Sequence, residues 1–396
     1  MYMSPRAKII GLVILKIVLS IFIIIGTFMS CVAVSFSLRW NLDSVIWAIL
    51  ICGFTALVFV WFGRVKWLRR TMVVVCAVVL SIGTGQYVQK LYHESLKVKD
   101  VNINVEEYLP YDSGSKIAVL SEGSTLRLTE NLPRVDGAAA LFPVYSAFVN
   151  AVYPKAACIL NEEYGVDAPF NYLNTVMGYK SLAEKRTDIF FGASPSERQI
   201  QYGKEQGTEF VYTPIGREAF VFFVNADSDV TSLTSEQIRR IYSGEITDWS
   251  EVGYHKGPIV AYQRNPGSGS QTMFEKFMSA DSRFMLMSPP NEEIVDTMMG
   301  ITNVVATYVN DNSAIGFSFR YYLDTLVNNP KIKMIAVDGV EPTVENIANG
   351  TYPIASEFYA VTRADDTNPN TQLFLDWILG PQGQELIEKT GYVPIS

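Results

Sequence analysis

The fold of this chain is indicated first by the stretch Arg264-Asn-Pro-Gly-Ser-Gly-Ser-Gln-Thr272. It lies between a β-rich run, Pro258 to Tyr262, and a helical pattern, Met273 to Met278. A strand that ends in such a turn and passes directly into a helix leaves backbone N–H groups unpaired at the positive end of the helix dipole. The turn therefore predicts a cradle for an oxyanion, although an ordinary capped helix after a loop would show the same residues.

The turn offers three kinds of donor to an anion. Ser268 and Ser270 carry hydroxyl groups, and Gly269 lets the backbone approach a ligand closely. Arg264 supplies a planar guanidinium group that can bind two oxygens of one ligand. We therefore expect Arg264, Ser268, Gly269 and Ser270 to contact the ligand, with Arg264 as the principal charge.

The chain divides into a basic, apolar N-terminal part and an acidic remainder. Residues 1–99 hold 11 of the 32 Lys and Arg residues and 2 of the 40 Asp and Glu residues, which leaves a formal charge of −17 on the remainder. This charge argues against nucleic-acid binding, because neutralising many phosphates requires Lys and Arg. With two histidines in the chain and one cysteine in the acidic part, no metal site, no disulfide within that part and no cofactor is predicted.

Three apolar segments predict membrane spans: Ile9 to Phe36, Val45 to Phe62 and Met72 to Val88. For the first segment, a cleaved signal peptide or a lipoprotein site at Cys31 is the alternative. The loop between the second and third spans is basic, so the positive-inside rule places the N-terminus in the cytoplasm and everything after the third span outside. We expect a multi-pass protein of the cell membrane whose acidic part is extracytoplasmic.

Beyond a polar connector, short β runs alternate with helical stretches, which predicts an α/β sandwich with mainly parallel sheets. The expected strands are Ser124–Leu128, Tyr145–Val152, Asp188–Phe191, Phe210–Tyr212 and Ala219–Asn225. Thr234 and Gln237 have the spacing of a capping box, which indicates that a helix starts there. The last helices are expected from Pro369 to Trp377 and from Gln384 to Lys389.

Seven separated stretches resemble the phosphate-type substrate-binding proteins of ABC importers, which have the type II periplasmic-binding-protein fold. They are Asp136–Pro143, Asp188–Ser194, Leu233–Trp249, Arg264–Thr272, Ala314–Phe317, Gly339–Asn346 and Gly383–Pro394. Their order and spacing match the family across about residues 125–396. The resemblance implies a two-lobed α/β domain of the Venus-flytrap kind, preceded here by three transmembrane helices.

The apolar segments and the polar connector predict the bounds of the first two parts of the chain, and the resemblance implies the bounds of the binding domain and its lobes. Residues 1–90 would form the three-helix transmembrane anchor, 91–124 an extracytoplasmic linker, and 125–396 the two-lobed substrate-binding domain. One lobe would comprise about 125–215 plus 350–396, and the other about 216–349. Hinge closure of the two lobes would clamp the ligand between them.

By the same resemblance, the first lobe adds ligand contacts to those of the turn. The backbone N–H groups of Ala140, Leu141 and Phe142 are expected to donate to the ligand, and Ser194 to donate its hydroxyl. Thr175 is included, although its surroundings depart from the Gly/Ser-rich turn of the family. Arg217 lies at the presumed hinge, where we expect an ion pair between the lobes rather than a ligand contact.

The chain departs from the family at two acidic positions. The family carries Asp after the Gly-Ala-Ser block and again two residues past the arginine, whereas this chain has Pro195 and Pro266. Such a carboxylate accepts a proton from phosphate and disfavours sulfate. We therefore expect weak discrimination against sulfate, or another anionic ligand, unless Glu197 or Asp136 replaces the acceptor.

These features predict a membrane-anchored extracytoplasmic solute-binding protein that captures a small oxyanion, with phosphate favoured, for an ABC importer. Permease subunits would be its partners. A membrane-tethered ligand sensor or scaffold with the same fold is the alternative, since three spans exceed what a tether needs. The sequence contains no evident nucleophile with its base, metal cluster or carboxylate pair, so an enzyme is not expected.

Overall fold

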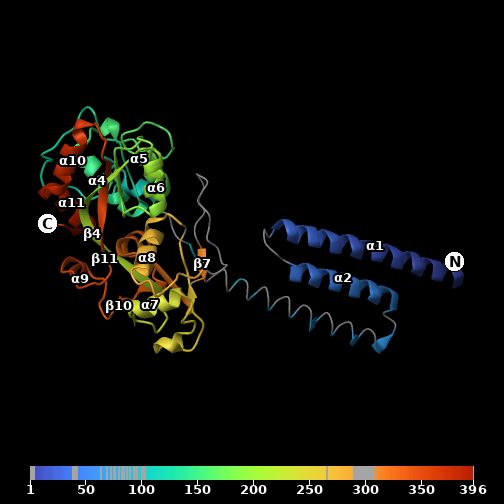
Figure 1. The fold of residues 1–396 in the computed structure, drawn as a ribbon. Helices are drawn as coiled ribbons and strands as arrows, with labels where there is room; N and C mark the ends of the chain where they lie inside the picture. The colour runs from blue at the N-terminus through green and yellow to red at the C-terminus, as the bar shows by residue number, and fades with distance from the viewer. Residues whose placement is uncertain are drawn as a thin grey trace. The chain divides into compact units, whose positions relative to one another are not determined.

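The structure is a computed structural model that describes residues 5–37, 43–62, 97–99, 104–264, 266–288, 307–309 and 311–395, with isolated residues between 65 and 91. The chain divides into two compact units, Met1–Leu96 and Lys97–Ser396 (Figure 1).

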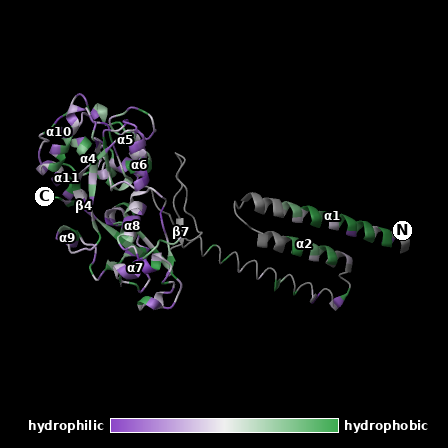
Figure 2. Ribbon diagram, viewed as in Figure 1, coloured by the Kyte–Doolittle hydropathy of each residue, from purple (hydrophilic) through white to green (hydrophobic). Residues whose placement is uncertain are grey.

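The N-terminal unit contains two apolar helices, α1 (Pro5–Ser37) and α2 (Asp43–Phe62), whose described residues are mostly green in the hydropathy colours of Figure 2. Lys16 and Ser20 of α1 both bond Trp61 of α2, with Lys16 Nζ 3.2 Å from the Trp61 carbonyl oxygen. Among the described residues, one helix is long and apolar enough to cross a membrane, Lys8–Met29, and a signal sequence would pass the same test. Much of the third predicted span, Met72–Val88, lies outside the described residues.

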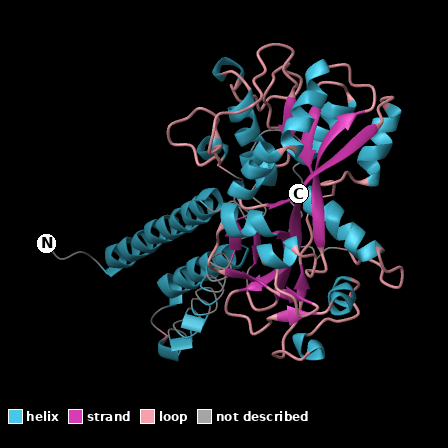
Figure 3. Ribbon diagram, turned by 90° about the vertical axis from the view of Figure 1, so that its left-hand side faces the viewer, coloured by secondary structure: helices cyan, strands magenta, loops and turns pink. Residues whose placement is uncertain are grey.

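The C-terminal unit is built on one long strand, β4 (Phe210–Asn225), which runs through both lobes. Its first part pairs antiparallel with β11 (Ala355–Arg363), and its second part pairs antiparallel with β8 (Ala314–Phe319). Figure 3 shows these strands passing from one lobe to the other. The main sheet has the order β2-β3-β11-β4-β8-β6, with β9 and β12 also paired to β4.

The remaining strands of this sheet are short: β2 (Val135–Gly137), β3 (Ile189–Gly192), β6 (Val260–Ala261), β9 (Ile332–Met334) and β12 (Val393–Pro394). Outside it, β5 (Ser232–Leu233) pairs with β10 (Ala336–Val337), and β1 (Lys97–Lys99) pairs with β7 (Thr307–Val309).

Each lobe has its own apolar core. Figure 1 shows α4 (Phe142–Val152), α5 (Asn174–Ala183), α6 (Glu197–Glu205), α10 (Pro369–Leu379) and α11 (Pro381–Thr390) in one lobe. The other lobe holds α7 (Ser235–Tyr242), α8 (Gly269–Ser279) and α9 (Val344–Ala348). Along β4, Ile215 belongs to the first core and Ala219 begins the second, so the strand changes core within a few residues.

The connector ahead of the first lobe packs against it. Tyr108 and Leu128 are buried in the first core. The Tyr111 hydroxyl donates to the Tyr153 carbonyl at 2.6 Å, and Lys389 Nζ donates to the Val119 carbonyl at 3.0 Å. The described part of the connector is therefore held on the surface of the binding domain.

Some expected elements are confirmed and some are wrong. Thr234 and Gln237 form a capping box at the start of α7, as predicted. Tyr145–Val152 is most of helix α4 and not a strand; ten of the eleven residues of α4 are buried, and a continuous apolar run does not distinguish a strand from a buried helix. Ser124–Leu128 forms no strand.

The main sheet is mixed, which corrects the expectation of mainly parallel sheets. Only β2–β3 and β6–β8 pair in parallel among its described strands, while β4 pairs antiparallel with each of its neighbours. The reason is that the crossing strands β4 and β11 run in opposite directions between the lobes. This connection is a property of chain topology and not of local sequence pattern.

Candidate functional site

The turn before α8 is closed by side chains of the helix itself. Ser268 is the N-cap residue, and its Oγ accepts from the Gln271 N–H at 3.2 Å. The buried side chain of Gln271 accepts from the Arg264 N–H at 2.8 Å. Gly267 has a φ of 81°, which favours glycine. These contacts leave the N–H groups of Gly269 and Ser270 at the positive end of α8, where no intrahelical acceptor exists.

This turn faces two segments of the first lobe. A Cβ atom placed on Gly269 would lie 3.8 Å from Thr175 Oγ1 and 3.8 Å from Ala193 Cβ. Gln199 Nε2, on α6, donates to the Gly267 carbonyl at 3.3 Å. Lys276 Nζ, further along α8, donates to Ser194 Oγ. The structure therefore brings Thr175 to Gly269 in the turn, and Ser194 to Lys276 further along the same helix.

The loop before α4 is arranged differently from the expectation. Ala139–Leu141 form a 3₁₀ turn in which the Leu141 N–H donates to the Ala138 carbonyl at 2.9 Å and the Phe142 N–H to the Ala139 carbonyl. The Leu141 and Phe142 side chains are buried in the first core. The N–H groups of Leu141 and Phe142 are thus engaged within the turn, and their contact with a ligand stays a prediction. The Ala140 N–H takes no part in these bonds.

The first-lobe loop is also tied to the C-terminal segment. The Ala140 carbonyl accepts from the Tyr392 hydroxyl at 2.6 Å. Among the described residues, no hydrogen bond joins this loop to the α8 turn.

In the α8 turn, Arg264 is partly buried and Ser270 is 9% exposed. Within the described chain, no cluster of three or more metal-ligating side chains is present.

Asp136 is fully enclosed between β2 and α5. Its Oδ1 accepts from the Gly137 N–H at 2.8 Å and from the Leu173 N–H at 2.9 Å, while Oδ2 has no partner in the described part of the chain. A Cβ atom on Gly178 would lie 3.0 Å from Oδ2. Burial raises the pKa of Asp136 to about 7. The carboxyl group is therefore packed against α5 and makes no bond to the α8 turn.

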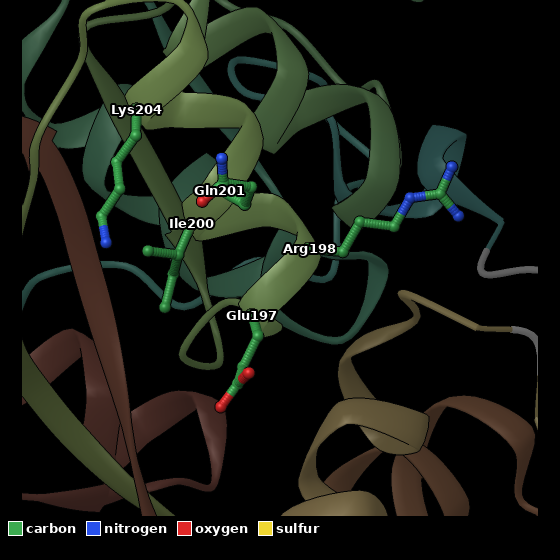
Figure 4. Close-up of a pocket in the computed structure, with 5 residues that line it drawn as sticks. All are labelled: Glu197, Arg198, Ile200, Gln201 and Lys204. Carbon is green, nitrogen blue, oxygen red and sulfur yellow. The ribbon is translucent and has the colours of Figure 1, made fainter.

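Glu197 lies on an open hollow along α6. The hollow has a volume of about 630 Å³ and is lined by Glu197, Arg198, Ile200, Gln201 and Lys204 (Figure 4). Gln199 is the residue of this helix that reaches the α8 turn. Neither Asp136 nor Glu197, the two alternative acceptors, is hydrogen-bonded to the turn among the described residues.

The ion pair at the hinge joins Glu218 to Arg320. This corrects the expectation that Arg217 forms the ion pair between the lobes. Arg320 Nε lies 3.4 Å from Glu218 Oε1, and both side chains are buried. Desolvation raises the pKa of Glu218 to about 7, and the charge of Arg320 opposes that rise. Adjacent residues of a strand point to opposite faces, so Arg217 points away from the buried side on which Glu218 lies. Within the described residues, Arg217 forms no ion pair.

Lys276, Gln199 and Gln271 were not among the residues expected at the site. Gln199 and Gln271 hold the backbone of the turn, and Lys276 contacts Ser194. A sequence signal existed for Lys276, because residues seven apart share one face of a helix and Gly269 lies seven residues earlier. This spacing does not show which residues of the first lobe the helix face contacts.

Residues 134–382 match a family model described as a PBP superfamily domain. Among curated relatives, the phosphate-binding protein PstS of Bacillus subtilis is 27% identical over 44% of this chain and 54% of its own length. PstS 2 of Streptococcus agalactiae is 33% identical over 35% of this chain and 47% of its own. The chain thus spans about half the length of these two relatives. PstS of Pseudomonas aeruginosa is 25% identical over 66% of this chain and 81% of its own length.

Two solved structures resemble the chain. One is a putative phosphate ABC transporter substrate-binding protein with bound phosphate from Clostridium perfringens, with a TM-score of 0.49 and 21% identity over 68% of this chain and 100% of that one. The other is an ABC-type phosphate transport receptor from Vibrio cholerae, with a TM-score of 0.47 and 20% identity over 66% of this chain and 99% of that one.

Proposed function

Because this chain belongs to the PBP superfamily, whose model matches residues 134–382, we propose that it is a membrane-anchored extracytoplasmic solute-binding protein that captures phosphate or a related oxyanion for an ABC importer. The observation that carries this proposal is the contact of helix α8 with the other lobe, in which Gly269 faces Thr175 and Lys276 contacts Ser194. The groups gathered there are N–H, hydroxyl and cationic donors. An ionised oxyanion offers acceptors alone, so the two sets are complementary.

The proposed contacts come from both lobes. The second lobe contributes Arg264, Ser268, Gly269 and Ser270, and the first lobe contributes Ala140, Thr175 and Ser194. Leu141 and Phe142 take a supporting part in this proposal, because their N–H groups hold the 3₁₀ turn that carries Ala140. Closure of the lobes about β4 and β11 would bring the two sets onto one ligand.

Phosphate is the first ligand to test because three relatives are named phosphate-binding proteins. The first two are matched over about half their length, so the substrate and the permease partners belong to the proposal. No observation on the described residues favours the sensor or scaffold alternative over the importer.

The proposal includes the arrangement in the membrane and the domain boundaries. Residues 1–90 would form three spans with a cytoplasmic N-terminus, and 91–124 would be the linker; α1 and α2 support the first two spans. The lobes would comprise about 125–215 plus 350–396 and about 216–349. The change of core along β4 supports the boundary between them.

Titration calorimetry of the full chain in detergent with phosphate tests this function and its site. We expect the wild type to bind and Arg264→Ala to bind at least about tenfold more weakly, since each charge-assisted hydrogen bond is worth about 1.5–3 kcal/mol. Unfolding of the variant should be little changed, because Arg264 is only partly buried.

Arg283→Ala is the matched control, because Arg283 is exposed and paired with Asp281 outside the turn. Its phosphate affinity should equal that of the wild type. Absence of phosphate binding by the wild type would overturn the proposed ligand. Unchanged affinity in Arg264→Ala would mean that the site lies elsewhere.

A further inference from the structure

Lys276 lies on the face of α8 that meets the first lobe. It follows Gly269 by seven residues, two turns along the helix, so the two share a face. Gly269 is opposite Thr175 and Ala193, and Lys276 Nζ donates to the hydroxyl of Ser194, the residue after Ala193. One helix face therefore presents the anion cradle and a cation to the same first-lobe loop.

The ammonium group of Lys276 is not neutralised by a carboxylate in the described part of the chain. The neighbouring Glu275 accepts instead from Gln271 Nε2 at 3.2 Å. Desolvation is the cause that lowers the pKa of Lys276, although the residue as a whole is exposed. The charged end has therefore lost part of its water without gaining a counter-ion. An anion held in the cleft would offset that cost.

The direction of the Lys276–Ser194 bond determines what Ser194 can do. An ammonium group has three donors and no acceptor, whereas a hydroxyl has one donor and two lone pairs. Ser194 must accept from Lys276, and its own O–H stays available to another acceptor. The next residue, Pro195, has no side-chain acceptor to take that proton. Lys276 thus makes Ser194 a donor for a ligand.

We propose that Lys276 is a specificity-determining residue of this cleft, an inference that rests on the proposed function. It holds Ser194 as a donor and adds a second positive charge to that of Arg264. Two cations favour a doubly charged tetrahedral oxyanion, such as hydrogenphosphate or sulfate, over a singly charged one such as dihydrogenphosphate. The alternative acceptors Asp136 and Glu197 make no hydrogen bond to the turn among the described residues, so neither of these two carboxylates is placed to favour a protonated ligand.

Calorimetry of the full chain with phosphate and with sulfate, at about pH 5 and about pH 8.5, tests this inference, since phosphate changes from monoanion to dianion between them. Sulfate keeps its charge, so its pH dependence reports protein groups alone and serves as the reference. The wild type should bind the phosphate dianion and sulfate with similar affinity. Lys276→Met should weaken both about tenfold, weaken the monoanion less, and flatten the pH dependence for phosphate.

Lys276→Arg keeps the charge and should restore most of the dianion affinity. Lys256→Met, an exposed lysine of the same lobe, should match the wild type. Combined with Ser194→Ala, Lys276→Met should cost less than the sum of the two single changes, because the two groups act together. Thermal unfolding run in parallel separates these effects from loss of fold.

Equal affinity of Lys276→Met and the wild type for both anions would overturn this inference and leave the proposed function standing. Equal losses for monoanion and dianion would overturn the role in specificity. A wild type that binds neither anion would overturn both proposals.

Discussion

Asp136 is a buried carboxyl group next to the loop that opens α4, and one of its oxygens has no partner among the described residues. Burial raises its pKa from 3.8 to about 7. The folded state therefore holds a proton that the unfolded chain releases at lower pH. The protonated Asp136 contributes fully to the free energy of unfolding below about pH 4, and this contribution is lost as the pH rises towards about 7.

Asp136→Asn should remove this pH dependence, because the amide keeps an acceptor for the Gly137 and Leu173 N–H groups but cannot ionise. Relative to the wild type, its free energy of unfolding should rise by up to about 3 kcal/mol between about pH 5 and pH 8. Denaturant unfolding of the full chain at the two pH values measures the difference. Glu218, whose pKa is also raised to about 7, is present in both proteins and cancels. Identical pH dependence in the two proteins would contradict the burial argument.

Helix α11 lies so close to the end of α10 that no side chain fits between the two helices at Gly383. A Cβ atom on Gly383 would lie 2.2 Å from the carbonyl oxygen and 2.4 Å from the Cα of Ile378. Both are backbone atoms and cannot move aside as a flexible side chain would. α11 also holds the connector, because Gln382 and Glu385 accept from the N–H groups of Thr125 and Ser121.

Gly383→Ala should therefore destabilise the binding domain by at least the ~1–3 kcal/mol typical of an overpacked core. It should also speed proteolysis between residues 104 and 128, because a shifted α11 releases the connector. Gly123→Ala is the control, since nothing lies within 4 Å of the added atom. Denaturant unfolding and limited proteolysis of the full chain measure both effects. Wild-type stability in Gly383→Ala would show that the two helices can separate at little cost.

At the scale of the whole molecule, the two lobes share two crossing strands and a buried ion pair. β4 and β11 pair from Phe210 to Ala219, and Glu218–Arg320 lies at the end of that pairing. Arg320 also donates to the Gly391 carbonyl at 2.6 Å, which ties the hinge to the C-terminal segment. Removing one partner of a buried ion pair leaves an uncompensated buried charge. Substitutions in this region should therefore destabilise the fold more than substitutions on the lobe surfaces do.

The charges around the apolar segments predict the membrane topology of the chain. A reporter that works only outside the cytoplasm should be active when fused after Ser396 and inactive when fused after Arg70, in the basic loop, and a reporter that works only in the cytoplasm should show the reverse. Paired enzymatic reporters that work in opposite compartments, with immunoblots for chain length, measure this. Cytoplasmic activity after Ser396 would overturn the number of spans and the importer proposal. Cleavage near Cys31 would replace the first span by a processed leader.

Features that depend on neighbouring residues could be predicted from the sequence. The donors of the turn from Arg264 to Ser270, the capping box at Thr234 and the first apolar helix all arise from short-range pattern, and the structure has each of them. Local propensity and capping chemistry act over a few residues, which is why the pattern is sufficient there.

The contacts of the α8 turn and the connections between strands could not be predicted from the sequence, because they depend on long-range packing. Lys276 and Ser194 are 82 residues apart and come together because the two lobes pack across the crossing strands. Glu218 pairs with Arg320 at the hinge because the strand turns the Glu218 side chain into the protein interior, where Arg320 is also buried. The sequence of Tyr145–Val152 does not distinguish a helix from a strand, because α4 is buried on nearly all sides and its apolar residues show no period. Such contacts depend on the path of the whole chain, which no local stretch specifies.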